Sequence, residues 1–242
     1  MHCFYIDKVD LKAHKVFISA EQAKHAHKVL RLKIGDQVTA FDGKGNQYRG
    51  ALETINSNSA VIAIEKLSHF EPPLPKITLA AAIPKQSKFD AIVDKATQLG
   101  VDMLIPLISE RTIVKPDLLK QNDKIIRWQK IAIEAAKQCG CLYVPRIAPI
   151  HSFNQIAKNA VKFDLAIIAA LSAQVVFIKD VFKKEKPESV LVLIGPEGDF
   201  TQQEVKFACD SGAIAVSLGK NVLRCETAST MVLSILNYEW KT

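Results

Sequence analysis

The chain of 242 residues is 48% hydrophobic, which is enough for a packed core in one large domain or two modest ones. Its 32 basic and 25 acidic residues give a net charge of +7, which favours a polyanionic partner such as nucleic acid, although basic enzymes without one are common. No apolar run approaches the ~20 residues of a membrane span, and the N-terminus lacks a signal-peptide pattern, so we expect a cytoplasmic protein without a membrane partner.

Residues 1–70 are expected to form a small β-barrel-like domain. Short runs rich in β-branched and aromatic residues predict strands, and turn residues separate them at 42–46 and 56–59. A helix is expected at 21–31, "EQAKHAHKVLR". The expected strands are 3–6, 15–19, 37–43, 47–55 and 60–67.

A proline-rich segment, "HFEPPLPK" at 69–76, interrupts this pattern. Proline neither continues a helix nor pairs in the middle of a sheet. The sequence therefore predicts a domain boundary there, between domains 1–70 and 76–242.

The second domain is expected to be α/β with a parallel sheet. Its apolar runs are continuous rather than alternating, which is typical of strands covered on both faces. The runs are 77–83, 103–108, 165–171, 190–194 and 213–218.

Two longer helices are predicted between these runs. One covers 87–100 and ends at Gly100, and the other covers 118–138. On the latter, one face is apolar and the basic residues lie elsewhere, on a solvated face or on a surface that faces RNA. The apolar positions are Ile125, Trp128, Ala132, Ala135 and Cys139, and the basic ones are Lys120, Lys124, Arg127 and Lys130.

The loop "GPEGDF" at 195–200 follows a buried strand and precedes a helix. Ligands of α/β proteins bind at such strand ends, but the loop has no phosphate-binding or dinucleotide-binding glycine pattern. Glu197 and Asp199 would repel phosphate, so we expect a ligand with a neutral or cationic contact, or else a plain strand-to-helix turn. Thr201 and Glu204 match a capping box, which fixes the start of the following helix.

A second informative stretch is "SLGKNVLRCETAST" at 217–230. Its apolar residues and free backbone groups suit a flat purine. Arg224 and Glu226 follow, as functional groups or as a structural ion pair, before a helix expected to begin near Thr227.

Four ordered motifs, at 25–36, 94–112, 193–204 and 218–228, resemble the RsmE-type ribosomal RNA methyltransferases of the SPOUT superfamily. The resemblance implies a PUA-like RNA-binding domain at 1–70 and, at 76–242, a SPOUT methyltransferase domain whose sheet is tied in a trefoil knot. It further implies methylation of ring nitrogen 3 of a uridine in 16S ribosomal RNA of the small subunit. The cofactor would be S-adenosyl-L-methionine, and the protein would be a homodimer.

The resemblance implies the cofactor contacts, and the roles of the other site residues are hypotheses from their chemistry and spacing. Arg224 would stabilise negative charge on the uracil, Glu226 would orient Arg224 or take the proton, and Arg111 would bind RNA or help hold the base. RNA contacts are expected at His25, Lys28, Arg31, Lys85 and Gln138. The first three are expected on one helix face, and the alternative is that this face is only solvated. Cofactor contacts are expected at Leu171, Ile194, Gly195, Pro196, Glu197, Gly198, Leu218, Gly219, Asn221, Val222, Leu223 and Thr227.

Glycine is expected at 195 and 198 because a Cβ would keep the backbone from the ligand. The chain departs from the family pattern at three places. Asp199 stands where the family usually has glycine, Cys225 where it has threonine, and Cys141 where it has arginine. The last departure weakens the case for a role of that helix end in RNA binding or catalysis.

Five cysteines at irregular spacing fit a reducing compartment better than a disulfide framework. Cys139 and Cys141 lack a partner pair, and His25 and His27 point in different directions, so no metal site is expected. Rival functions are methylation of a ribose hydroxyl or another base, a non-catalytic ribosome-assembly factor, and, more distantly, a dinucleotide-dependent enzyme.

Overall fold

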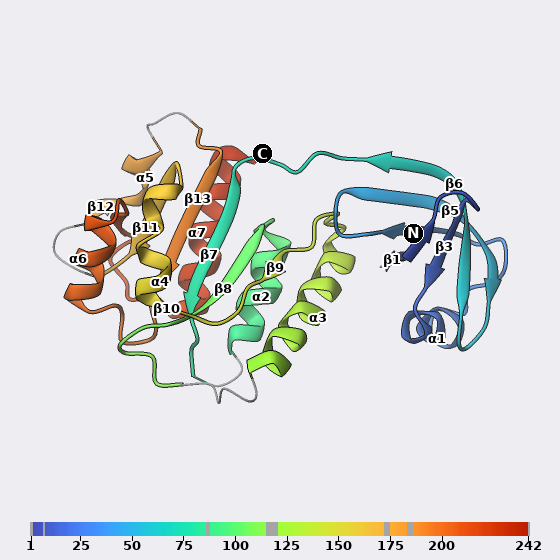
Figure 1. Ribbon diagram of the computed structural model, residues 1–242, viewed down its shortest axis with the longest axis horizontal. Helices are drawn as coiled ribbons and strands as arrows, with labels where there is room; N and C mark the ends of the chain where they lie inside the picture. The colour runs from blue at the N-terminus through green and yellow to red at the C-terminus, as the bar shows by residue number, and fades with distance from the viewer. Residues whose placement is uncertain are drawn as a thin grey trace. The chain divides into compact units, whose positions relative to one another are not determined.

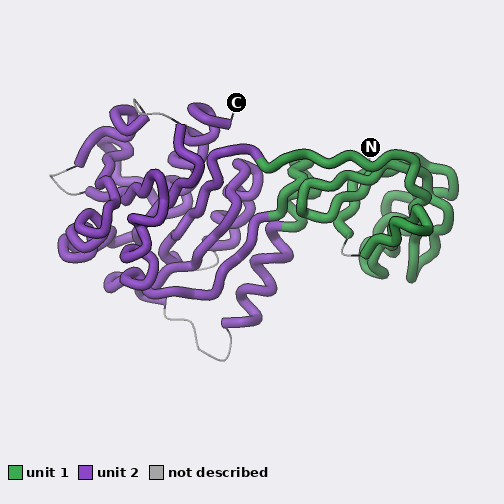
Figure 2. Tube along the Cα trace, turned by 45° about the horizontal axis from the view of Figure 1, so that its top comes forward, with its two compact units in different colours: residues 1–72, 133–144 green, residues 73–132, 145–242 purple. Residues whose placement is uncertain are grey.

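A computed structural model describes residues 2–6, 8–85, 88–114, 121–171, 175–182 and 186–241. The chain divides into two compact units (Figure 2). Unit 1 contains residues 1–72 and 133–144, and unit 2 contains residues 73–132 and 145–242. Residues 133–144 lie within the predicted second domain, 76–242, but they cluster with unit 1. The limits of the functional domains stay a prediction.

Unit 1 is built on a six-stranded sheet with the order β1-β4-β5-β6-β3-β2 (Figure 1). The β1–β4 pair is parallel and the other pairs are antiparallel. The predicted strands and helix are present. Strand β2 was not predicted, because its three residues contain no apolar run. The elements are β1 Cys3–Tyr5, β2 Lys8–Asp10, β3 Lys15–Ile18, α1 Ala20–Lys28, β4 Gln37–Phe41, β5 Asn46–Ile55 and β6 Ala60–His69.

The core of unit 1 lies between the sheet and α1. Ala23 and Ala26, three residues apart on α1, are fully buried against sheet residues such as Val16, Val38 and Ile62. Their spacing places them on one helix face, which explains why the opposite face can carry lysines and histidines.

Helix α1 is shorter than predicted. The backbone N–H groups of Val29 and Leu30 both donate to the carbonyl of His25, and Arg31 has a left-handed backbone with φ of 56°. This conformation ends a helix. The prediction that His25, Lys28 and Arg31 share one helix face is therefore wrong for Arg31, while His25 and Lys28 are exposed in the last turns.

Unit 2 contains a parallel sheet with the order β10-β8-β7-β13-β11-β14-β12, and β9 also pairs with β8. The prediction of a parallel α/β sheet is confirmed, because all five apolar runs form paired strands. The two-residue strands β9, β10 and β12 were not predicted, because two residues are too few to show an apolar run or an alternation. The strands are β7 Lys76–Ala82, β8 Met103–Ile108, β9 Arg146–Ile147, β10 His151–Ser152, β11 Leu165–Ala169, β12 Val176–Phe177, β13 Ser189–Ile194 and β14 Ile214–Ser217.

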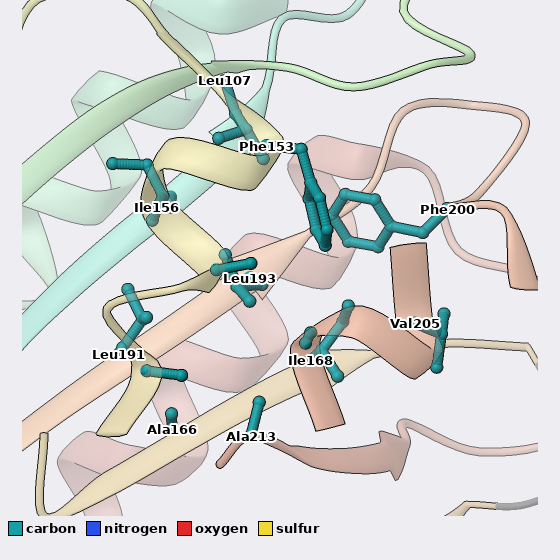
Figure 3. Packing of buried hydrophobic residues seen from close by; sticks show 14 of the residues in the cluster. Leu107, Phe153, Ile156, Ala166, Ile168, Leu191, Leu193, Phe200, Val205 and Ala213 are labelled. Atoms are coloured by element: carbon teal, nitrogen blue, oxygen red, sulfur yellow. The ribbon is translucent and has the colours of Figure 1, made fainter. Parts of the chain in front are cut away.

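Helices cover both faces of this sheet (Figure 1). Side chains alternate along β13, so Leu191 and Leu193 pack with α4 and α6, as Figure 3 shows, and α7 lies against β13 and β7 on the other face. The helices are α2 Lys88–Gln98, α3 Gln121–Cys139, α4 Phe153–Ala157, the 3-10 helix Ala160–Lys162, α5 Ile178–Val181, α6 Gln202–Asp210 and α7 Cys225–Trp240.

Helix α3 begins in unit 2, where its apolar face is largely as predicted. Trp128 is buried and its indole N–H donates to Asp90 of α2 at 3.0 Å, while Arg127 also pairs with Asp90. Ala132 and Ala135 are buried, but Cys139, predicted to pack, is exposed. Predicted helix residues 118–120, with Lys120, lie outside the described residues.

Within the described part of the chain, no helix is long and apolar enough to cross a membrane.

Candidate functional site

A pocket opens at the carboxyl edge of the sheet in unit 2. It lies where β13, β11 and β14, neighbours in the sheet, end in three loops. This is the edge at which α/β sheets bind ligands. The lining residues are Ala169, Ala170, Leu171, Ile194, Gly195, Pro196, Glu197, Asp199, Leu218, Gly219, Asn221, Val222, Leu223, Cys225 and Ala228.

Most residues predicted to contact the cofactor meet in this pocket, and their contact with a ligand stays a prediction. Gly198 and Thr227 are exposed and do not line it. Five lining residues were not predicted: Ala169, Ala170, Asp199, Cys225 and Ala228. Helical spacing offered a signal for the last two, because Cys225 and Ala228 are three residues apart at the start of α7.

The pocket lining is apolar and acidic. Leu171 and Val222 line it with 58% and 71% of their surfaces exposed, so they present uncovered apolar area to a ligand. Glu197 and Asp199 contribute carboxylates, and the described lining residues include neither Lys nor Arg. Such a lining suits a ligand with a flat apolar part and a cationic part, and it disfavours a phosphate.

The loop after β13 folds on itself as a tight turn. The N–H of Asp199 donates to the carbonyl of Pro196 at 2.9 Å, and Asp199 has a left-handed backbone with φ of 60°. Its carboxylate accepts the N–H of Phe200 and the N–H of Leu171, each at 2.8 Å. Side chain and backbone of Asp199 thus join two loops that line the pocket.

The steric reason for glycine at 195 is internal to the loop. A Cβ there would lie 3.1 Å from the Phe200 nitrogen and 3.2 Å from Asp199 Oδ1, which is too close for ordinary contact. At Gly198 a Cβ would approach only the Arg111 side chain, at 3.5 Å or more. The turn itself thus gives a steric reason for glycine at Gly195, and Gly198 shows no such constraint. The expected reason, room for the ligand, stays a prediction at both positions.

The predicted capping box at the start of α6 is confirmed. Thr201 Oγ1 accepts the N–H of Glu204 at 3.2 Å, and Glu204 Oε2 accepts the N–H of Thr201 at 2.9 Å. Glu204 is buried, and its Oε1 accepts the N–H of Glu110 in the loop after β8. The capping box therefore also fixes the neighbouring loop.

Two of the predicted RNA-contacting or catalytic residues border the glycine loop. Arg111 Nη1 donates to the carbonyl of Gly198 at 2.7 Å, and the backbone N–H of Lys85 donates to Glu197 Oε1 at 3.0 Å. Both residues are exposed. Arg111 thus stabilises the glycine loop through its hydrogen bond to Gly198.

Arg224 and Glu226 lie at the start of α7, which begins at Cys225, two residues before the predicted start. Glu226 Oε1 lies 3.9 Å from Lys88 Nζ, so its ionic partner is Lys88 rather than Arg224, contrary to the alternative of an Arg224–Glu226 ion pair. Arg224 is exposed directly after the pocket wall at 218–223. Its guanidinium is accessible to a substrate.

Cys225 is a buried wall residue, not a reactive thiol. Its Sγ donates to the carbonyl of Ala82 at 3.5 Å, and burial together with the nearby carboxylates of Glu226 and Glu197 raises its pKa to about 12. The thiol form is therefore kept at neutral pH.

Thiol labelling should distinguish Cys225 from the exposed cysteines. At about pH 8.5, where an ordinary thiol is half ionised, Cys139 and Cys209 should react and Cys225 should stay unmodified until the chain is unfolded. Mass spectrometry of the alkylated peptides measures the labelling, and labelling of Cys225 as fast as Cys209 would contradict the prediction.

The raised pKa of Cys225 also makes its effect on stability depend on pH. Because the pKa in the folded protein is raised above 9.0, the contribution of Cys225 to stability is present below that pH and is lost as pH rises toward about 12.

The remaining candidate positions lie elsewhere. Gln138 is exposed near the end of α3, and His25 and Lys28 are exposed on α1. Among the described residues, no group of three His, Cys, Asp or Glu side chains is placed to hold a metal ion.

Comparison with known proteins identifies the chain's relatives. A family model for the RNA methyltransferase domain matches residues 71–237, and one for the RNA methyltransferase PUA domain matches residues 18–65. The expectation of a PUA-like N-terminal region is thereby confirmed. The knot stays a prediction.

Individual relatives agree along most of the chain. The ribosomal RNA small subunit methyltransferase E of Bacillus subtilis is 32% identical over 92% of this chain and 89% of its own length. That of Synechocystis is 34% identical over 92% of this chain and 72% of its own. The crystal structure of the Neisseria gonorrhoeae enzyme of that name, bound to S-adenosyl methionine, has a TM-score of 0.89 and 28% identity, covering 99% of this chain and 98% of that one. The chain thus belongs to the RNA methyltransferase family that includes the small-subunit methyltransferases E.

Proposed function

We propose that the protein transfers the methyl group of S-adenosylmethionine to ring nitrogen 3 of a uridine in 16S ribosomal RNA of the small subunit. The observation that carries this function is the three-loop pocket, whose walls are the segments that resemble the family's cofactor motifs. The relatives named as small-subunit methyltransferases support the RNA substrate.

The pocket residues fit this cofactor. S-adenosylmethionine has a flat adenine, a cationic sulfonium and no phosphate. Leu171, Val222 and Leu223 offer apolar surface for the adenine, and Glu197 and Asp199 provide the negative charge that favours a cation. The bound cofactor supplies an activated methyl group, so this chain has to bind it, exclude water and align the acceptor.

The acceptor side of the reaction falls to residues at the start of α7. The N–H at ring position 3 of uridine lies on the pairing edge and is weakly acidic, so the base has to be unpaired and lose this proton. We assign Arg224 to stabilise the negative charge that develops on a flanking uracil oxygen. Glu226, held near Lys88, orients Arg224 or accepts the proton.

RNA recognition is assigned to exposed residues of the PUA-like region, of the loops next to the pocket and of the end of α3. The exposed His25 and Lys28, with Arg31 beyond the helix end, provide cationic or hydrogen-bonding contacts for phosphate. Lys85, Arg111 and Gln138 are assigned to the same RNA. We further propose that the protein acts as a homodimer in the cytoplasm, that its functional domains are 1–70 and 76–242, and that no metal takes part.

A methylation assay tests this function. The purified protein is incubated with labelled S-adenosylmethionine and small ribosomal subunits that lack the modification, and the RNA is digested to nucleosides. We expect label in 3-methyluridine. Label in a 2′-O-methylated nucleoside or another base would instead support a different methyltransferase specificity, and absence of cofactor binding would support a non-catalytic assembly factor.

A further inference from the structure

Asp199 holds two walls of the pocket together. The loop 195–199 forms one wall, and residues 169–171 at the end of β11 form the next. Asp199 Oδ2 accepts the N–H of Leu171, 28 residues away in the chain, at 2.8 Å, and Oδ1 accepts the N–H of Phe200 at 2.8 Å. A single side chain thus connects the two loops.

The Leu171 contact lies just beyond the regular pairing of the sheet. The pairing of β11 with β13 ends at Ala169, opposite Ile194, and the N–H of Ala170 donates to the carbonyl of Val216 on the β14 side. Leu171 N–H then turns to Asp199 on the β13 side. The wall at 169–171 is therefore tied to β14 by backbone and to the glycine loop by the Asp199 carboxylate.

The backbone conformation of Asp199 and its carboxylate have separate roles. With φ of 60° the position favours glycine, and Asp and Asn are among the few other residues that adopt it readily. The glycine usual in the family pattern would satisfy the turn but could not bond to Leu171. The carboxylate is thus a feature that the turn itself does not require.

We propose that Asp199 is a positioning residue that fixes the separation of the loop 195–199 and the wall 169–171, and so keeps the cofactor pocket formed before binding. This inference rests on the proposed function. Without the carboxylate, part of the binding free energy goes into ordering Leu171 and its neighbours. The loss appears in cofactor affinity and not in turnover at saturating cofactor, because the Asp199 carboxylate acts by bonding to the two pocket walls.

Three substitutions separate the carboxylate from the backbone strain. Asp199→Gly keeps the favoured backbone and removes both acceptors, Asp199→Asn keeps one acceptor, and Asp199→Ala removes both and adds strain at positive φ. We expect the Kd for S-adenosylmethionine to rise about tenfold in Asp199→Gly, the loss of about one hydrogen bond in binding free energy, and less in Asp199→Asn. The kcat at saturating cofactor should stay within about twofold. Asp199→Ala should match the affinity of Asp199→Gly at a lower melting temperature.

Hydrogen exchange at the Leu171 amide gives a readout that is independent of activity. Exchange should be faster in free Asp199→Gly than in the free wild-type protein, and bound cofactor should restore its protection. Asp210→Asn is the matched control, since Asp210 is exposed on α6 and pairs with Lys206 on the same helix. It should change neither the Kd nor the exchange.

Two results would overturn the inference: wild-type affinity in Asp199→Gly, or unchanged exchange at Leu171. A fall in kcat with unchanged affinity would also contradict it, because it would assign Asp199 to the chemical step. If the wild-type protein itself fails to bind the cofactor, the proposed function fails, and this result differs from one in which wild type and Asp199→Gly bind equally.

Discussion

Arg224→Ala should reduce methylation by at least about 100-fold, the effect of removing a preorganised charge from a site where negative charge develops. Cofactor affinity should stay at the wild-type level, because Arg224 does not line the pocket and its neighbour Glu226 pairs with Lys88. The measurements are single-turnover methylation of the small subunit and the Kd for S-adenosylmethionine. Unchanged turnover would remove Arg224 from the catalytic residues.

Lys220→Ala is the control for Arg224→Ala. Lys220 is exposed on the same loop and carries the same charge, but it does not line the pocket. Lys220→Ala should keep turnover within about threefold, as expected for an exposed charge outside the pocket. Arg224→Lys separates charge from geometry, since lysine keeps the charge but loses the planar fork of donors. An equal loss in Lys220→Ala and Arg224→Ala would indicate a general effect of charge on RNA binding.

The sheet of unit 2 was predictable because its strands are covered on both faces. A strand such as β13, whose residues 190–194 are all nearly or fully buried, must be apolar at every position, and that run is visible in the sequence. The capping box was predictable for a similar reason, because the partners Thr201 and Glu204 are three residues apart. Features that depend on residues close together in the chain can be recognised from residue type and spacing.

The interactions that shape the pocket depend on residues far apart in the chain. Asp199 accepts the N–H of Leu171, and Arg111 donates to the carbonyl of Gly198, which is 87 residues away. No spacing rule connects such positions. The steric demand on Gly195 could not be predicted for the same reason, because the atoms that exclude its Cβ belong to a turn whose shape was unknown.

The end of α1 shows a different limit of sequence reasoning. The residues 29–31, Val-Leu-Arg, favour a helix, and nothing in their type marks an end. The helix nevertheless stops after Lys28, and Leu32 N–H donates back to the carbonyl of Ala26. Leu30 and Leu32 then pack against the core of unit 1, so tertiary packing overrides the local preference.

The Phe200 ring links the glycine loop to the core of unit 2, and its removal should be strongly destabilising. The ring is 3% exposed, and its centroid lies 4.9 Å from that of Phe153. Figure 3 shows the two rings next to each other. Phe200→Ala should lower the free energy of unfolding by about 3–5 kcal/mol, the cost of deleting a buried aromatic side chain. The measurement is urea unfolding followed by tryptophan fluorescence, which reports on unit 2 because Trp128 and Trp240, the two tryptophans, both belong to it.

Phe207→Ala provides the matched control for this prediction. Phe207 is the same residue type on the adjacent helix α6, but it is 39% exposed. Its removal should cost less than about 1 kcal/mol, since a partly exposed ring leaves a smaller cavity. Phe200→Ala should also weaken cofactor binding, because the ring anchors the backbone of residue 200, whose N–H bonds to Asp199 in the pocket wall, whereas Phe207→Ala should leave binding unchanged. Equal destabilisation by the two substitutions would show that the Phe200 ring does not anchor the loop.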